Sequence, residues 1–328
     1  MTAHRLGFAV KVLGAGGLPS HDTRRWQSEP HLRHSLERLR AILDYLDAND
    51  IRMYRVATAL APYASHPDLT QFHGQVDECA AELAAVGRLV RERDIRLSSH
   101  PGQYTVLNSV DPAVQAAAVA ELEVQAALFD AMGLGAEAVV VLHVGGTAGG
   151  IAAACDRFLA GFERLSDAAR RRLVIENDDR SFGTQDVVQL ANRAGLRVVW
   201  DVLHHHCNDS VGMSDREAIG AALSTWPSEL TPKIHYSSPR LDVETRKLRR
   251  GRRVEQQIVL PQLRAHADLV DPIGFERFML DVAGERAFDV MLEAKAKDLA
   301  VLRLREQLAA RGFPSERGRV MLSPALAG

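Results

Sequence analysis

Six residues that can bind a metal ion or move a proton lie at the ends of short apolar segments of this chain. Three of these segments present a histidine and three present a carboxylate. A polar group at the end of a buried segment lowers stability unless it is paired or coordinated, so six such cases favour one shared metal site over separate structural roles. The residues are His100, His143, Glu176, Asp201, His235 and Glu293.

The elements that must position these residues are strands that alternate with helices. Short apolar or β-branched runs bounded by turn residues are typical of strands buried on both faces. Asp111 is a predicted N-cap, Pro112 a first-turn residue, and Gly133 and Gly195 are predicted helix terminators. Helices are predicted around residues 31–48, 74–93, 111–133, 150–165, 184–194, 214–223 and 296–311.

This alternation predicts an α/β protein with a single (β/α)8 barrel of the TIM type. In such barrels the active site is built at the C-terminal ends of several different strands. A doubly wound open sheet is the alternative architecture, but inward-pointing ligands from many strands favour the closed barrel. The 328 residues fit one barrel, so residues 1–328 are predicted to form a single domain.

Composition excludes several protein classes. No stretch is long and apolar enough to span a bilayer, and the N-terminus lacks the series of regions that make a signal peptide. We therefore expect a cytoplasmic protein that makes no membrane contact. Cys79, Cys155 and Cys207 are odd in number and widely spaced, which indicates neither a disulfide framework nor a zinc finger.

The ligand types narrow the chemistry. Histidines with carboxylates and no thiolate suit Zn²⁺ or Mn²⁺ and do not suit an iron–sulfur or Cu(I) site. The candidate ligands outnumber those that one tetrahedral ion uses, which indicates two or three ions with Glu176 as a natural bridge. Clustered divalent ions are a common device for phosphodiester cleavage. No glycine-rich phosphate loop follows a strand, so a nucleotide cofactor is not expected.

A basic run, TRKLRRGRRVEQQ, is the one compositional break in the chain. Two interpretations stay open: a solvated helix face, or a phosphate-backbone contact at the rim of the barrel. Because the formal net charge is only −2, any affinity for nucleic acid must come from such a local patch. The basic residues are Arg246, Lys247, Arg249, Arg250, Arg252 and Arg253.

Seven short motifs resemble the UV damage endonuclease family, whose members look like relatives of endonuclease IV on an α/β barrel. They are, in order, SSHPGQY, VLHVGG, IENDD, DVLHHH, PKIHYSS, AHAD and LEAKAKD. The resemblance implies an ATP-independent enzyme that nicks double-stranded DNA on the 5′ side of a UV photoproduct, leaving a 3′-hydroxyl and a 5′-phosphate. Cyclobutane pyrimidine dimers, 6-4 photoproducts and abasic sites are the implied substrates. A monomer, nucleoid-associated when bound to DNA, is expected.

The resemblance also implies the metal and its ligands. Mn²⁺ is the expected ion, with Zn²⁺, Co²⁺ and Mg²⁺ as alternatives. His66, in YASHPD, matches a family histidine near the scissile phosphate. Of the three consecutive histidines, His204 is the predicted ligand rather than His205 or His206. The ligands implied by the motifs are His100, His143, Glu176, Asp201, His204, His235, His266 and Glu293.

Lys233 lies two residues before His235, and alternate residues of a strand share a face, so it points toward the same site. The matching lysine of the family can be carboxylated, which turns a cation into a carbamate that faces the metal. A lysine that binds a DNA phosphate explains the same position, and both interpretations stay open.

Gln103 and Tyr104 match residues that the family inserts into the duplex at the lesion. An aromatic ring can fill the space left by extruded bases, and an amide can occupy vacated hydrogen-bonding edges. Near the N-terminus this chain departs from some family members, which carry Tyr and Asn where Phe8 and Val12 stand. Phe8 keeps a stacking surface and is predicted to contact DNA, whereas Val12 cannot hydrogen-bond, so lesion preference is expected to differ.

Two other functions use similar residues. A sugar isomerase or epimerase of the xylose-isomerase type also places Glu, Asp and His at barrel strand ends with Mn²⁺, but it needs fewer metals, a small closed pocket and no basic rim. A non-catalytic lesion-binding protein would not need the full ligand set. A nicking assay on irradiated plasmid, with and without EDTA, separates the three.

Overall fold

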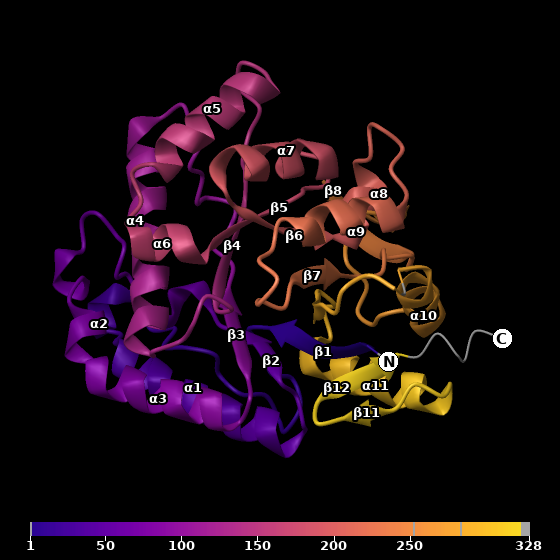
Figure 1. The fold of residues 1–328 in the computed structure, drawn as a ribbon, viewed down its shortest axis with the longest axis horizontal. Coiled ribbons are helices and arrows are strands. Elements are labelled where there is room, and N and C mark those ends of the chain that lie inside the picture. The colour runs from indigo at the N-terminus through magenta and orange to yellow at the C-terminus, as the bar shows by residue number, and fades with distance from the viewer. Residues whose placement is uncertain (1, 252, 283, 323–328) are drawn as a thin grey trace.

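Eight parallel strands close into a barrel in the computed structural model, which describes residues 2–251, 253–282 and 284–322 (Figure 1). Each barrel strand pairs with the next along the chain, and the last, β10, pairs with the first, β1. The predicted closed barrel is confirmed and the open sheet is excluded. The barrel strands are β1 (Thr2–Ala9), β2 (Met53–Arg55), β3 (Arg96–Ser99), β4 (Val139–His143), β5 (Leu173–Glu176), β6 (Arg197–Asp201), β7 (Lys233–Tyr236) and β10 (Asp289–Leu292).

A helical segment follows every barrel strand and covers the outside of the barrel (Figure 1). The predicted helices are confirmed, except that the segment predicted at 74–93 is broken at Cys79. Three helices, α6, α8 and α10, are absent from the predictions. The helices are α1 (Leu32–Ala48), α2 (Gln75–Glu78), α3 (Ala80–Glu92), α4 (Pro112–Ala131), α5 (Ile151–Phe162), α6 (Asp167–Arg172), α7 (Thr184–Ala194), α8 (Val202–Cys207), α9 (Asp215–Ser224), α10 (Pro272–Asp281) and α11 (Lys297–Ala310).

Local chemistry explains where the longer helices begin and end. The Asp111 carboxylate accepts a hydrogen bond from the Ala113 amide at the start of α4, with Pro112 as the first helical residue. Helix α7 ends at Gly195, whose φ of 64° lies in the left-handed region that favours glycine. None of the helices in the described part of the chain is long and apolar enough to cross a membrane.

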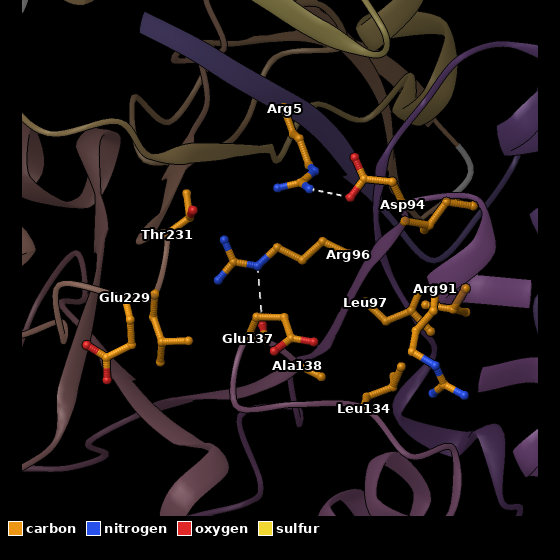
Figure 2. Close-up of a pocket in the computed structure, with 13 residues that line it drawn as sticks. Arg5, Arg91, Asp94, Arg96, Leu97, Leu134, Glu137, Ala138, Glu229 and Thr231 are labelled. Atoms are coloured by element: carbon orange, nitrogen blue, oxygen red, sulfur yellow. Dashed lines mark hydrogen bonds and ion pairs between the residues drawn. The ribbon is translucent and has the colours of Figure 1, made fainter. Parts of the chain in front are cut away.

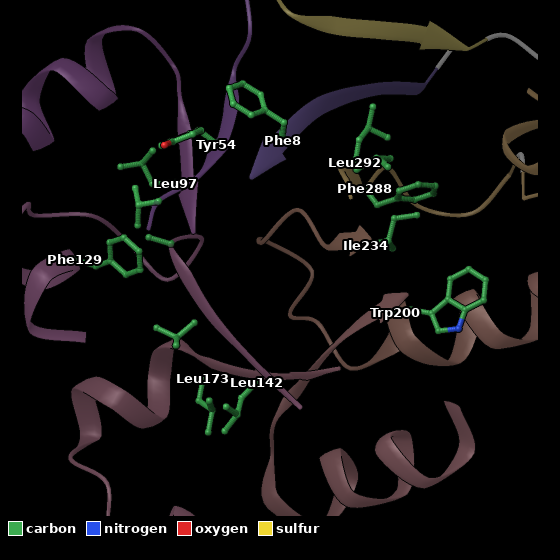
Figure 3. Close-up of a cluster of buried hydrophobic side chains, with 14 of the residues drawn as sticks. Phe8, Tyr54, Leu97, Phe129, Leu142, Leu173, Trp200, Ile234, Phe288 and Leu292 are labelled. Carbon is green, nitrogen blue, oxygen red and sulfur yellow. The ribbon is translucent and has the colours of Figure 1, made fainter. Parts of the chain in front are cut away.

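Two apolar cores lie on the two faces of the barrel sheet. The larger fills the layer between strands and helices, where Phe8, Tyr54, Leu97 and Phe129 pack (Figure 3). The smaller lies inside the barrel. It contains Val139, Val141, Val174, Val199 and Trp226. Because both faces are apolar, the strands read as continuous hydrophobic runs rather than alternating ones.

Strand alternation arranges the barrel interior in levels from the N-terminal to the C-terminal end. The side chains of Arg96, Ser98 and His100, along and just beyond β3, all point into the barrel, because alternate residues of a strand share a face. Lys233 and His235 point inward from β7 in the same way. Gly7 of β1 lies at the middle level, where a Cβ would stand 2.6 Å from the Met53 carbonyl oxygen. A glycine is needed there to let the strands approach. Ser98 and Lys233 therefore lie between Arg96 at the N-terminal end and the histidines at the C-terminal end.

Four strands lie outside the barrel. β11 (Ser315–Glu316) and β12 (Arg319–Leu322) form a hairpin that pairs antiparallel with the start of β1. β8 (Glu244–Arg250) and β9 (Arg253–Val259) form a second antiparallel hairpin between β7 and α10. The basic run is therefore a β-hairpin, and the interpretation as a helix face is wrong.

Candidate metal centre

Glu176 lies among four histidines at the C-terminal end of the barrel. Its Oε2 is 3.0 Å from Nε2 of His100 and 3.8 Å from Nε2 of His143. Its Oε1 is 2.9 Å from Nδ1 of His235 and 3.5 Å from Nδ1 of His204. Each oxygen of this carboxylate therefore lies close to imidazoles from different parts of the barrel rim. This is the arrangement of a bridging ligand.

A second carboxylate, Glu293, follows β10 on the other side of His235. Its Oε1 is 3.3 Å from His235 Nδ1 and 2.5 Å from Nη1 of Arg55, and its Oε2 is 3.8 Å from His266 Nδ1. Arg55 is missing from the sequence predictions, although it ends a barrel strand as the ligands do. Arginine binds no metal, so a search for ligands passes over it.

The third carboxylate, Asp201, ends β6 and caps the helix that follows. Its Oδ1 accepts a hydrogen bond of 2.7 Å from the His204 amide, so α8 turns back over the barrel and brings the His204 ring to the cluster. His204 Nδ1 lies 2.9 Å from the Asn177 carbonyl oxygen. Donation from Nδ1 to that oxygen leaves the lone pair of Nε2 free to bind a metal.

The two neighbouring histidines lie elsewhere. His205 is buried, with its Nδ1 3.0 Å from Thr184 Oγ1. His206 pairs at 2.8 Å with Asp215 on the surface. Among the three consecutive histidines, His204 is thus the one at the cluster, as predicted.

Buried polar atoms without partners test whether this cluster fits a metal. Asp201 Oδ2, His143 Nδ1 and His235 Nε2 are all buried and make no hydrogen bond. Such atoms are costly in an apolar interior and are explained by an ion. The donors are nitrogen and oxygen only, which suits Mn²⁺ or Zn²⁺. Three groups have ligand atoms mutually within 4.8 Å: His100 with His143 and Glu176, His100 with His235 and Glu293, and Glu176 with Asp201 and His204.

Burial and neighbouring charges shift the pKa values of the cluster in both directions. Burial raises the pKa of Asp201 to about 7, and the Glu176 and Glu293 carboxylates add to the effect. Burial lowers the pKa of His235 to about 4. Burial also opposes protonation of His204, but Asp201 and Glu176 outweigh it and raise the pKa of His204 to about 9. Divalent cations between these carboxylates would offset their repulsion.

Lys233 lies one level below His235, completely buried inside the barrel. Its Nζ donates a hydrogen bond of 3.1 Å to Ser98 Oγ. Burial, together with the positive charges of Arg55 and Arg96, holds the pKa of this lysine well below its usual range. An amine enclosed in this way has no path to a DNA phosphate outside the barrel, which counts against the phosphate-binding interpretation.

Gln103 and Tyr104 lie in the exposed loop after β3, next to His100 of the cluster. The Tyr104 side chain is 84 % exposed. A cavity of about 340 Å³ beside this loop is lined by Gln103, by His143 and His204 of the cluster, and by Asp179 and Arg180 among others. The loop therefore lies at the mouth of the candidate metal site.

His66 lies farther along the rim. It is exposed and lines a second cavity of about 320 Å³, which also has Tyr63, Tyr104 and Glu121 in its wall. His66 Nδ1 accepts a hydrogen bond from the Asp68 amide. Within the part of the chain that the structure describes, no contact joins His66 to the metal ligands, so it belongs to the rim and not to the cluster.

Phe8 is not available to DNA. Its side chain is completely buried and packs edge-on against Tyr54, with ring centroids 5.3 Å apart (Figure 3). Val12 is buried as well. Phe8 points outward from β1 into the helix layer because its neighbour Gly7 faces the barrel interior. The prediction that Phe8 offers a stacking surface to DNA is therefore wrong, because Phe8 is a core residue.

The basic hairpin provides four predicted DNA contacts, of which the structure describes one side chain. Arg249 is exposed in β8. Arg252 lies outside the described residues, and the side chains of Arg250 and Arg253 are not described. The hairpin belongs to the loop that follows β7, so it emerges at the same end of the barrel as the metal ligands.

A cavity of about 370 Å³ opens at the opposite, N-terminal end of the barrel (Figure 2). Arg96 lies in it with Arg5, and both guanidinium groups bind Asp289, at 2.9 and 3.2 Å respectively. Glu137, on the same wall, accepts a hydrogen bond from Arg96 Nε through its backbone oxygen. The buried carboxylate at this end of the barrel, Asp289, is therefore held in ion pairs with arginines.

Comparisons with known proteins identify the family. The profile of the family described as UV-endonuclease UvdE matches residues 31–313. The chain is 31% identical over 287 residues to the UV DNA damage endonuclease of Bacillus velezensis, covering 85% of this chain and 82% of that protein. It is 29% identical over 294 residues to the UV DNA damage endonuclease of Bacillus cereus strain G9842, covering 88% and 86%.

Solved structures give the same picture. The crystal structure of SacUVDE superimposes with a TM-score of 0.78 at 29% identity, covering 94% of this chain and 99% of that one. A D-tagatose 3-epimerase-like protein superimposes with a TM-score of 0.55 at 10% identity. The second likeness extends to the barrel fold alone, so it lends the sugar-isomerase interpretation nothing beyond a shared architecture.

Proposed function

Because the chain belongs to the UV-endonuclease UvdE family, we propose that it is a metal-dependent endonuclease that nicks double-stranded DNA on the 5′ side of UV photoproducts. The products are a 3′-hydroxyl and a 5′-phosphate, and abasic sites are further substrates. Residues 1–328 act as one barrel domain, as a monomer and without a nucleotide cofactor. The observation that carries the proposal is Glu176, within reach of four histidines at the C-terminal end of the barrel.

The proposed metal ligands form three groups, each with one carboxylate and the histidines near it. Glu176 bridges, while Asp201 and Glu293 stand on either side of it with their own histidines. Bound there, two or three divalent ions, Mn²⁺ first among them, supply charge against the scissile phosphate and lower the pKa of a water that can attack it. The ligands are His100, His143, Glu176, Asp201, His204, His235, His266 and Glu293.

Arg55 has a separate part in this arrangement. Its Nη1 binds Glu293 Oε1 at 2.5 Å, so the carboxylate is held in one orientation before any ion arrives. The guanidinium is largely buried, and a second oxygen of Glu293 stays directed at His266. Arg55 is therefore a positioning residue for a ligand rather than a ligand itself.

Lys233 fits carboxylation better than phosphate binding. It is fully buried, and among the described residues no carboxylate lies within ion-pair distance of its Nζ. A neutral amine attacks the carbon of CO₂ with its lone pair and loses one proton, which leaves a carbamate anion. That anion extends the side chain toward the level of His235 and turns a buried cation into a metal-facing oxygen ligand.

DNA contacts lie on the rim around the cluster. Gln103 and Tyr104 fill the helix where damaged nucleotides leave the stack, and their exposure beside the ligand His100 supports this role. His66 donates a hydrogen bond to a phosphate near the cleavage point from its place on the same rim. Arg249, Arg250, Arg252 and Arg253 contact phosphates through the hairpin that follows β7.

The test is incision of a defined duplex that carries one thymine dimer. Protein stripped with EDTA and reloaded with Mn²⁺ should cut immediately 5′ to the dimer, leaving an end that a polymerase extends and a second end that phosphatase changes. The matched undamaged duplex should stay intact. Equal cutting of both duplexes, or cutting that survives complete metal removal, would contradict the proposal. Release of a base without strand cleavage would contradict it too.

A further inference from the structure

The β8–β9 hairpin is rooted beside the metal centre. The loop that carries it leaves β7 after Tyr236, and its two legs are joined at the base by a bridge between Pro239 and His266. His266 lies 3.8 Å from the Glu293 carboxylate. The hairpin position is therefore fixed relative to the ligands.

Strand register divides the hairpin into two faces. Directly opposed residues of an antiparallel pair share a face, and successive residues along a strand change face. One face, which we name the outer face, carries three opposed pairs: Thr245 with Ile258, Lys247 with Gln256, and Arg249 with Val254. The other, the inner face, carries Glu244 with Val259, Arg246 with Gln257, and Leu248 with Glu255.

The inner face carries carboxylates of its own, Glu244 and Glu255. Glu244, Arg246 and Val259 line a cavity of about 250 Å³ together with Arg240 and other residues of the hairpin base. Glu244 forms an ion pair with Arg240, and it lies 3.1 Å from Arg246 Nη2. The positive charge of Arg246 is thus neutralised within the hairpin.

The outer face has free charge and exposed apolar surface. Among the described residues, no carboxylate lies within ion-pair distance of Lys247 or Arg249, so both charges are available to a partner. Val254 is 56 % exposed and Ile258 is 69 % exposed on the same face. Gln256 stands between these two, opposite Lys247. The face therefore combines two cations, an amide and two apolar side chains.

Duplex DNA matches this combination. Lys247 and Arg249 are two residues apart on one strand, about 7 Å, or roughly two base-pair rises along a duplex. A two-stranded β-ribbon fits the major groove, where an amide can reach base edges and aliphatic groups can contact thymine methyls. A charged surface for phosphates alone would not expose Val254 and Ile258.

We propose that the outer face of the β8–β9 hairpin docks in the groove of undamaged duplex next to the lesion. This inference rests on the proposed function and assigns the hairpin a task separate from lesion recognition. It holds the duplex arm against the metal centre, while the rim around Tyr104 tests the damaged step. Its contribution to affinity is then the same for damaged and undamaged DNA.

Two single substitutions and a matched control test the face assignment. Lys247→Gln and Arg249→Gln should each weaken binding to a thymine-dimer duplex and to the undamaged duplex by the same factor, on the order of threefold to tenfold at low salt. Each should also make the slope of log affinity against log salt shallower by about 0.9. Arg246→Gln removes the same charge type from the inner face and should leave affinity within about twofold. An effect of Arg246→Gln as large as that of Arg249→Gln would overturn the face assignment.

Groove docking is separated from plain phosphate contact by the form of the DNA. Val254→Ser with Ile258→Ser should weaken duplex binding with no change in salt slope, and should leave binding of the corresponding single strand unchanged. Equal losses on duplex and single strand would overturn groove docking. Far-UV circular dichroism of each variant shows whether the barrel is folded.

The experiments can contradict the proposed function and the hairpin proposal independently of each other. Wild-type protein that binds duplex through Lys247 and Arg249 but never nicks the dimer substrate contradicts the endonuclease proposal alone. Wild-type protein that nicks the dimer, with outer-face variants that bind like wild type, contradicts the hairpin proposal alone.

Discussion

The two ends of the barrel interior both hold buried charges, and they handle them in opposite ways. At the N-terminal end Arg5 and Arg96 both bind Asp289. Arg5 also pairs with Asp94 (Figure 2), so the charges are neutralised by the chain itself. At the C-terminal end Asp201 Oδ2 and His235 Nε2 are buried without hydrogen-bond partners. The N-terminal network therefore stabilises the fold as it stands, whereas the proposed metal site at the C-terminal end would take its compensating charge from cations in solution.

Lys233 lies at the level between these two ends. Below it, Asp289 is its register partner in the neighbouring strand, and above it His235 belongs to the cluster. The ion pairs of Asp289 are taken by two arginines. Lys233 therefore gains no counter-charge from below, and a carboxyl group on its amine would join it to the upper end.

Breaking the N-terminal network should have the largest effect of all, and on stability. Asp289→Ala leaves Arg96 buried without its carboxylate and removes the hydrogen bonds to Arg5, so the free energy of unfolding should fall by about 3–5 kcal/mol. Denaturant unfolding measures this loss. Glu306→Ala, which removes an exposed partner of Arg303, is the control and should cost no more than about 0.5 kcal/mol. Equal losses for the two variants would show that the N-terminal network is energetically no different from the surface.

Breaking the C-terminal cluster should instead abolish activity. Glu176→Gln keeps the shape of the bridging side chain but removes the charge between the histidines, so incision should fall by at least about 100-fold, or roughly 2.7 kcal/mol of transition-state stabilisation. Incision of a thymine-dimer duplex and metal content by mass spectrometry measure the two effects. Near-normal incision at unchanged metal content would remove Glu176 from the mechanism.

Sequence alone could predict the residues at the C-terminal end of the barrel, because each of them follows a strand. The C-terminal ends of parallel strands meet at one edge, so His100, Glu176 and Asp201 could be brought together without knowledge of the packing. Sequence alone could favour one of the three consecutive histidines as the ligand but could not decide among them. The reason is that the short helix α8 is capped by Asp201, and this cap determines which histidine ring faces the cluster.

The N-terminal network could not be predicted in this way. Arg96 and Asp289 are 193 residues apart, and neither stands out among the many charged residues of the chain. Phe8 was misplaced because a strand buried on both faces has no polar face to show which residues point inward. The basic run was misplaced because its cations follow no helical or strand period strongly enough to decide between helix and hairpin.

Metal removal should sharpen the contrast between the two ends. Each divalent ion bound at 100 times its dissociation constant should raise the free energy of unfolding by about 2.7 kcal/mol, because only the folded chain assembles the ligands. Thermal or denaturant unfolding with Mn²⁺ and with EDTA measures this difference. Asp289→Ala should lose the same amount on chelation as wild type, since distant sites add independently. A chelation effect that disappears in Asp289→Ala would mean that the two ends are coupled through the barrel.

The smallest effect belongs to the rim, where neither fold nor metal depends on the side chains. Tyr104 is 84 % exposed and Gln103 is exposed beside it, so their removal breaks no buried contact. Unstacking a damaged step costs a few kcal/mol, and inserted side chains offset part of that cost. Gln103→Ala with Tyr104→Ala should therefore lower affinity for a thymine-dimer duplex by about tenfold, or about 1.4 kcal/mol, with unchanged stability and metal content. The loss should be smaller at an abasic site, where one base is already missing and less has to be extruded. Binding to the two matched duplexes at one salt concentration tests this, and equal affinity of wild type and double variant for the dimer would refute the insertion role.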